Sequence, residues 1–173
     1  MKQIRAAAIL VAMSIPAAAQ HGQHASPYAG LQHREIKALD AKQMDDLRTG
    51  RGMSLALAAE LNGYPGPLHT LELADDLGLT AAQRERVQAV FASMKAEAVP
   101  LGERLIREEA ELDRLFATRS ITHEALARLT ATIGLTQAAL RNSHLKFHLA
   151  TVDVLSPVQV QRYKHLRGYE AHK

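Results

Sequence analysis

Cysteine and tryptophan are absent from the 173-residue sequence, and aromatic residues make up only 4% of it. Without a thiol the chain can form no disulfide, thiolate metal site or cysteine nucleophile. Hydrophobic residues nevertheless account for 47% of the sequence, and most of them are alanine and leucine. This composition predicts slim helices packed on one another instead of a thick globular core.

The motifs of common enzyme classes are also missing. The sequence contains no glycine-rich phosphate loop and no dinucleotide-binding fingerprint. Its serines do not stand in the glycine elbow that presents a nucleophile. We therefore expect that the protein is not an enzyme.

One short apolar run lies at the N-terminus. Lys2 and Arg5 lead into an apolar stretch over residues 6–15, and residues 17–19 form a small-residue cleavage site. This pattern predicts a cleaved signal peptide over residues 1–19 and a periplasmic location; the alternative is an uncleaved anchor. Once the peptide is removed, 19 basic residues stand against 18 acidic ones, a net charge of +1. We expect no nucleic-acid partner and no transmembrane segment in the mature chain.

The rest of the chain predicts an all-α fold. Residues 20–27 form a flexible tail, and residues 28–173 form a single helical domain with no segment typical of a strand. Two long helices are predicted, with shorter flanking helices and a break at Asn62–Pro67. The predicted helices cover residues 28–39, 41–61, 68–77, 79–116, 122–154 and 157–169.

The two long helices carry apolar residues at heptad spacing, which predicts that they pack lengthwise on each other. Glu108 interrupts this seam and is expected to pair with an arginine or to mark an opening, while Pro100 is expected to bend the helix. A separate apolar stripe on the second helix predicts a further partner, such as a second subunit. The seam residues are Val87, Phe91, Met94, Ala98, Leu101, Leu105, Leu112 and Leu115, then Leu126, Leu129, Ile133, Leu140, Phe147, Ala150 and Val154; the separate stripe is Leu145, Leu149 and Val152.

Two copies of one short motif open predicted helices. Leu79-Thr80-Ala81-Ala82-Gln83 and Leu155-Ser156-Pro157-Val158-Gln159 each place a hydroxyl at the N-cap and a glutamine three residues later. This spacing is typical of a capping box, in which the hydroxyl accepts from the glutamine N–H and the glutamine side chain accepts from the N-cap N–H. A looser copy begins at Leu39. By themselves, such signals predict only where helices start.

The pair of motifs in an exported helical chain resembles the Spy/CpxP family, which includes metal-responsive relatives of the CnrX and ZraP kind. The resemblance covers about residues 68–169. It implies a long antiparallel helical hairpin that dimerises into a curved cradle. It also implies binding of unfolded or envelope clients without ATP, or sensing of divalent metals, in some cases with a membrane sensor partner. Residues 28–66 have no counterpart in a typical member.

Histidines supply the candidate metal ligands. His144 and His148 are four residues apart, so their imidazoles lie on one side of a helix and can share an ion. Further ligands must come from elsewhere: His69, Glu72 and His33 are the candidates, with zinc, nickel or copper as the metal. The alternative is a pair of solvated or helix-packed histidines.

A client-binding or dimer surface has candidates on the first long helix. Arg84, Arg104 and Arg107 could provide a basic rim, and Met94 and Leu101 apolar contacts. The alternatives are a solvated charged face and core packing. The leading expectation is thus a periplasmic, dimeric, ATP-independent chaperone or envelope-stress protein, and the alternative is a periplasmic heavy-metal sensor or metal-binding protein.

Overall fold

The computed structural model describes residues 26–169, and within this range the regular structure is helical. Its elements are η1 (Leu31–His33), α1 (Ala41–Thr49), α2 (Leu57–Glu60), α3 (Pro67–Glu72), α4 (Ala81–Ala117), α5 (His123–Val152) and α6 (Pro157–Leu166). No strand occurs between residues 26 and 169, and none of the helices there is long and apolar enough to cross a membrane. The predicted signal peptide lies outside the described residues.

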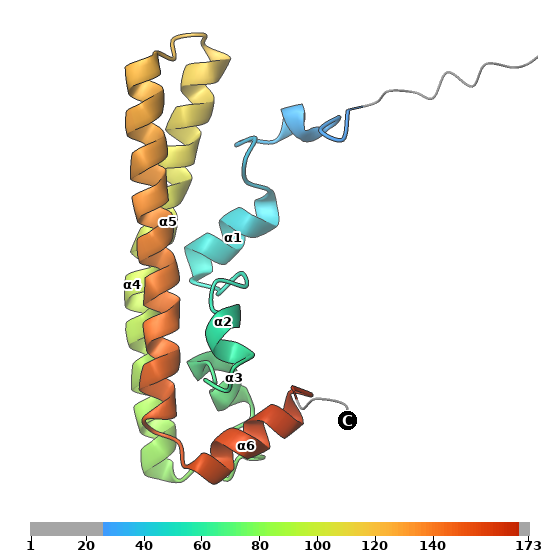
Figure 1. Cartoon of the computed structure of the whole chain (residues 1–173), viewed down its shortest axis with the longest axis vertical. Helices are drawn as coiled ribbons and strands as arrows, with labels where there is room; N and C mark the ends of the chain where they lie inside the picture. Colours follow the sequence, from blue (N-terminus) through green and yellow to red (C-terminus); the bar gives the residue numbers. More distant parts are fainter. Residues whose placement is uncertain (1–25, 170–173) are drawn as a thin grey trace, which may run out of the picture.

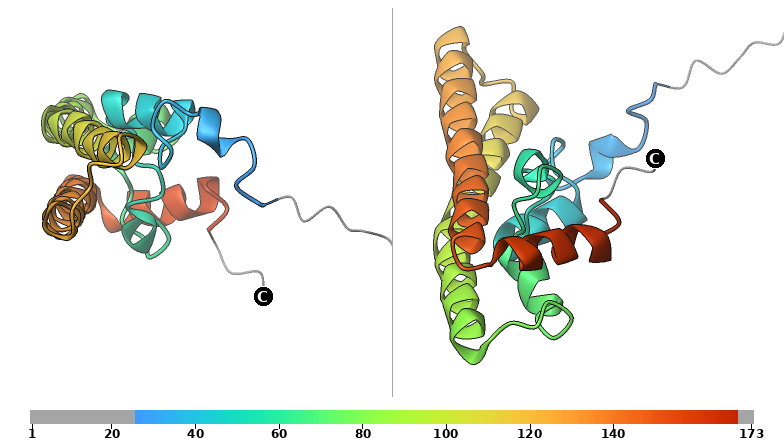
Figure 2. Two further views of the ribbon diagram at one scale, coloured as in Figure 1. Left: turned by 90° about the horizontal axis from the view of Figure 1, so that it is seen from above. Right: turned by 60° about the horizontal axis from the view of Figure 1, so that its bottom comes forward.

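α4 and α5 form a long hairpin that runs along the longest axis of the molecule (Figure 1). The short helices α1, α2 and α3 lie along one side of this hairpin, and α6 turns back beneath them (Figure 1). Seen from above, both hairpin helices lie on one side and all the smaller elements on the other (Figure 2). The predicted all-α class, with long helices and shorter flanking helices, is confirmed.

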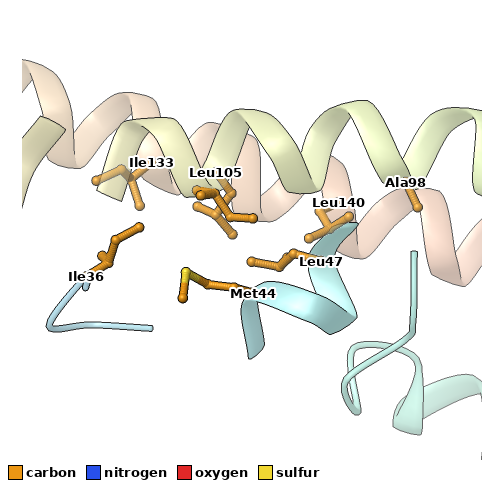
Figure 3. Packing of buried hydrophobic residues seen from close by; sticks show 8 residues of the cluster. Ile36, Met44, Leu47, Ala98, Leu105, Ile133 and Leu140 are labelled. Atoms are coloured by element: carbon orange, nitrogen blue, oxygen red, sulfur yellow. The ribbon is translucent and has the colours of Figure 1, made fainter. Parts of the chain in front are cut away.

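The core lies where α1 packs against the hairpin. Ala98 and Leu105 on α4 and Ile133 and Leu140 on α5 are buried, as the heptad spacing predicts. Side chains from the N-terminal part of the chain complete the same cluster (Figure 3). These additional residues are Ile36, Met44 and Leu47.

Pro100 and Glu108, the two positions that depart from the apolar pattern, both lie inside α4. α4 continues without interruption through Pro100. The Thr136 hydroxyl donates to Glu108 Oε1 over 3.1 Å, and Arg104 Nε lies 3.5 Å from the same oxygen. Of the two alternatives that the sequence leaves open for Glu108, the structure shows the pairing with an arginine.

The chain before the hairpin is less helical than the sequence predicts. The prediction of a helix over residues 28–39 is wrong, because only η1 forms in this range. Ile36 is buried in the irregular segment that follows and forms an isolated β-bridge with Leu39. The single helix over residues 41–61 was also wrong. α1 ends at Thr49, where Gly50 with its left-handed φ of 69° is the C-cap, and α2 begins only after an irregular stretch. This stretch breaks the helical pattern because Met53 and Ser54 also have positive φ angles.

Candidate metal centre in a histidine-lined pocket

Both repeated motifs form complete capping boxes. Thr80 Oγ1 accepts from Gln83 N over 3.2 Å, and Gln83 Oε1 accepts from Thr80 N over 3.1 Å. Ser156 and Gln159 repeat this arrangement, at 3.3 Å and 2.9 Å. The earlier copy, Asp40 with Gln43, is a capping box as well. The start signals read from the sequence are confirmed.

The two motif glutamines also bind each other. Gln83 Nε2 lies 2.9 Å from Gln159 Oε1, and Gln159 Nε2 lies 3.1 Å from Gln83 Oε1. Gln83 Nε2 additionally donates to the Val154 carbonyl over 3.0 Å. Since Gln159 Nε2 lies 3.4 Å from the Leu77 and Gly78 carbonyls, each glutamine contacts the backbone that precedes the other motif.

The leading leucine of each motif is buried in a common cluster. Leu79 and Leu155 are 8% and 9% exposed and pack with Ala74, Leu77 and Tyr163. Every characteristic residue of the motif therefore has a structural role that joins the starts of α4 and α6. None of them is left free to bind a ligand.

The candidate metal ligands gather elsewhere, in a pocket of about 710 Å³ between α3, α4 and α5. His69 and Glu72 from α3 and His144 and His148 from α5 all line it. His33 does not: it lies in η1, where its Nε2 is 3.1 Å from the Gln32 amide nitrogen. The pocket thus brings together four of the five candidates that the sequence indicates.

His144 is the most deeply buried of these side chains. It is 2% exposed, and its Nε2 atom is buried without a hydrogen-bond partner. Burial, and then the neighbouring His148, lower the pKa of His144. A lowered pKa favours the neutral form of the ring, which is the form that binds a metal. A buried polar atom without a partner is costly, so this nitrogen requires an explanation.

His148 is oriented by the backbone. Its Nδ1 lies 2.6 Å from the Tyr64 carbonyl oxygen, which can only accept, so Nδ1 carries a proton. In the tautomer protonated at Nδ1 alone, Nε2 presents a lone pair. A Cβ placed on Gly66 would lie 2.9 Å from Cε1 and 3.0 Å from Nε2 of His148, so the ring packs directly against this glycine. Metal-binding histidines are held in this manner, with the second nitrogen donating to a carbonyl or carboxylate.

His69 shows the same arrangement with a carboxylate. Its Nδ1 lies 2.8 Å from Glu72 Oε2, and its side chain is 38% exposed. Its Nε2 atom is thereby left for a further partner, and the exposed ring can change rotamer. Glu72 orients the His69 ring here.

These groups do not form a finished site. Within residues 26–169, no three His, Cys, Asp or Glu side chains are grouped closely enough to hold a metal ion as they stand. The pocket offers the His144–His148 pair, with His69 on the facing helix as the third imidazole. A transition ion here would need a third ligand closer to the pair, through another His69 rotamer or another position of α3.

One buried group beside the pocket has no signal in the sequence. Glu60 in α2 is 7% exposed and accepts from the Tyr163 hydroxyl over 2.5 Å. Burial, and then this hydrogen bond and the carboxylate charge, raise the pKa of Tyr163. The tyrosine therefore stays a donor, and only the tertiary structure shows that α2 and α6 meet here.

The predicted client surface is only partly exposed. Met94 is 6% exposed and lines the histidine pocket, and Leu101 packs against the core. Arg84 and Arg104 are paired with Asp75 at 2.8 Å and with Glu108 at 3.5 Å, whereas Arg107 is exposed. Met94 is therefore placed for pocket packing and not for contact with a client.

Other large apolar side chains are exposed instead. On α5, Leu135 is 73% and Leu149 54% exposed, and Phe116 at the end of α4 is 53% exposed. Leu135 and Leu149 stand two heptads apart, so they share one side of the helix. Leu149 belongs to the separate stripe read from the sequence, while Leu145 and Val152 are half-buried.

No family model matches this chain, and no curated protein or solved structure shows significant similarity to it. The resemblance to the Spy/CpxP family thus stays a hypothesis that depends on the two motifs.

Proposed function

We propose that this protein binds a transition-metal ion in the pocket between α3, α4 and α5, as a metal-binding or metal-sensing protein of the exported kind. The observation that carries the proposal is the buried, unpartnered Nε2 atom of His144. A metal ion at this atom would remove the cost of its burial. His148 supports the same interpretation, because its Nδ1 bond to the Tyr64 carbonyl leaves Nε2 available in the same pocket.

The chemistry of the lining favours zinc, nickel or copper. Neutral imidazoles suit these ions, whereas magnesium and calcium prefer oxygen ligands. His69 would be the third ligand, held by Glu72 as its supporting carboxylate. The supply of a third ligand from a short, partly exposed helix would make binding depend on a rearrangement of α3, which suits a sensor.

Zinc titration by calorimetry tests the proposal on the mature chain without an affinity tag. Every protein carries His21→Ala and His24→Ala, which remove the tail histidines as competing ligands. We expect one zinc ion per chain, and at least about tenfold weaker binding after His144→Ala with His148→Ala. His69→Ala should also weaken binding, and since His69 is partly exposed this variant spares the core.

The matched control is His123→Ala, an exposed histidine at the start of α5. It should bind zinc as the parent does. Circular dichroism melts of each variant separate loss of a ligand from loss of the fold. The metal proposal fails if the double variant, still folded, binds zinc with the affinity of the parent.

A second candidate function is holding of unfolded clients, and the exposed leucines of α5 favour it. Leu135 and Leu149 are large apolar side chains that are 73% and 54% exposed on one side of α5. Covering apolar segments of a client on this side of α5 would keep the client from aggregating. A homodimer could use the same side of the helix.

Light scattering of an aggregating unfolded protein tests this second function. The mature chain at several-fold molar excess should suppress the scattering, and Leu135→Gln with Leu149→Gln should remove at least about half of the effect. Ala131→Gln with Ala139→Gln changes exposed positions of the same helix and serves as the control. An absence of suppression by the parent chain excludes this function.

A further inference from the structure

A single buried carboxylate, that of Glu60, connects the histidine pocket to the C-terminal helix. On one side, Oε1 accepts from the Tyr163 hydroxyl over 2.5 Å and from the Tyr169 hydroxyl over 3.1 Å. Arg167 Nε lies 3.7 Å from the same oxygen. Oε1 thus contacts α6 and the residues that follow it.

The other oxygen faces the pocket. Oε2 accepts from the Gly66 N–H over 3.2 Å and lies 3.7 Å from His148 Nδ1. A Cβ on Gly66 would lie 2.9 Å from Cε1 of the same imidazole, so the Gly66 backbone is close to the ring. The His148 ring is therefore enclosed by the Tyr64 carbonyl, the Glu60 carboxylate and the Gly66 backbone.

Packing alone does not explain why a carboxyl group is buried at position 60. A carboxyl group that is 7% exposed loses most of its hydration, and its hydrogen bonds and the nearby Arg167 only offset that cost. An apolar side chain of similar size would fill the space without the penalty. A group that joins three segments at such a cost points to a role in arranging them.

We propose that Glu60 is a positioning residue for His148 and that it couples metal binding in the pocket to the docking of α6. A cation at Nε2 makes the Nδ1–H of an imidazole a stronger donor. The Nδ1–H then attracts the Tyr64 carbonyl and Glu60 Oε2 more strongly, so the carboxylate is held more firmly, and with it the hydroxyls of Tyr163 and Tyr169. Metal binding should tighten α6, and by reciprocity the loss of the α6 contact should weaken metal binding.

This inference depends on the proposed metal binding, and its test has two readouts. The first is hydrogen exchange of the α6 amides over residues 157–166 in the parent chain, with and without zinc. Zinc should slow this exchange about threefold or more, and Glu60→Gln should abolish the slowing. A purely structural role for Glu60 would not make α6 respond to zinc.

The second readout is the zinc affinity of Tyr163→Phe, which removes one hydroxyl outside the pocket lining. We expect about three- to tenfold weaker binding. Tyr64→Phe is the matched control, since Tyr64 is 40% exposed and only its backbone carbonyl contacts the site; it should bind zinc as the parent does. Thermal melts check that the variants fold.

The two proposals fail in different ways. If the parent binds zinc through His144 and His148 but α6 exchange does not change and both tyrosine variants bind alike, the coupling is wrong and the metal site stands. If the parent binds no zinc, both proposals are wrong.

Discussion

The motif glutamines show how much one side chain contributes when it serves two helices. Gln83 caps its own helix and also binds Gln159 and the Val154 carbonyl. We expect Gln83→Ala and Gln159→Ala each to lower the free energy of unfolding by about 1–2 kcal/mol. The double variant should lose less than the sum, with a coupling energy of about 1 kcal/mol, because the first change already breaks the mutual bond.

Gln43→Ala is the internal control for this cycle. Gln43 completes a capping box with Asp40, but no hydrogen bond joins it to another helix in the described part of the chain. Gln43→Ala should lower the free energy of unfolding by less than Gln83→Ala, and the effects of these two substitutions should be additive. Urea unfolding of the single and double variants measures all of these terms. Strict additivity of Gln83→Ala and Gln159→Ala would contradict the cross-helix role.

Glu109 carries a pH-dependent cost. Burial, and then the charge of Glu108, raise the pKa of Glu109 from its ordinary value of 4.5. The pKa of Glu109 is higher in the folded than in the unfolded state, so the folded protein holds this proton more tightly. The stabilisation from the bound proton is fully present below about pH 4.5 and is lost as the pH rises through the folded-state pKa. Glu109→Gln removes the disfavoured charge. We expect a gain in unfolding free energy of less than about 1 kcal/mol at pH 7, with none at pH 4.

Glu111 is the matched control of opposite sign. The hydrogen bond from Arg114 lowers the pKa of this carboxyl, whose side chain is 44% exposed. Glu111→Gln should therefore slightly reduce stability at pH 7. Urea unfolding at both pH values compares the two variants, and equal effects at pH 7 would argue against this account of the two shifts.

At the scale of the elements, one glycine determines how closely α1 approaches α4. A Cβ on Gly102 would lie 2.3 Å from the Leu47 carbonyl oxygen and 2.8 Å from its carbon. These are backbone atoms, so the two helices must separate. We expect Gly102→Ala to lower the unfolding free energy by about 2–3 kcal/mol.

Gly134→Ala is the control for the helix propensity of alanine. A Cβ at this exposed position of α5 meets no atom within 4 Å. This variant should be more stable by about 0.5–1 kcal/mol, the ordinary gain from replacing a helical glycine. Thermal denaturation measures the stability changes of the two variants, which should have opposite signs. A Gly102→Ala protein as stable as the parent would disprove the close packing.

The same scale shows why some elements were predictable. The N-caps of α4, α5 and α6 are Thr80, Thr122 and Ser156, whose side chains accept from the N–H three residues on. Such caps are local, so the sequence predicts them well. α1 and α2 were predicted as one helix because the apolar pattern continues past Gly50. The break comes from the left-handed φ of Gly50 and the positive φ angles of Met53 and Ser54, and the spacing of apolar residues carries no signal for these backbone angles.

Across the whole molecule, the smaller helices cover only part of the hairpin. α1, α2 and α3 pack near its lower and middle parts, and its upper end projects beyond them (Figure 1). We expect amides of residues 110–128 to exchange with deuterium at least about tenfold faster than those of residues 87–106 and 136–151, because they are less well covered. Uniform protection along both helices would indicate that another element or a second subunit covers this end.

By itself, the sequence determined the helical class, the long hairpin helices, their capped starts and the residues of the seam. These features follow from periodicity and from hydrogen bonds between residues close in the chain. Only the tertiary structure decided that Gln83 meets Gln159, that His69 and His144 line one pocket, and that Glu60 contacts α6. A buried polar group is satisfied by partners from distant segments, and no local pattern shows which segments will meet.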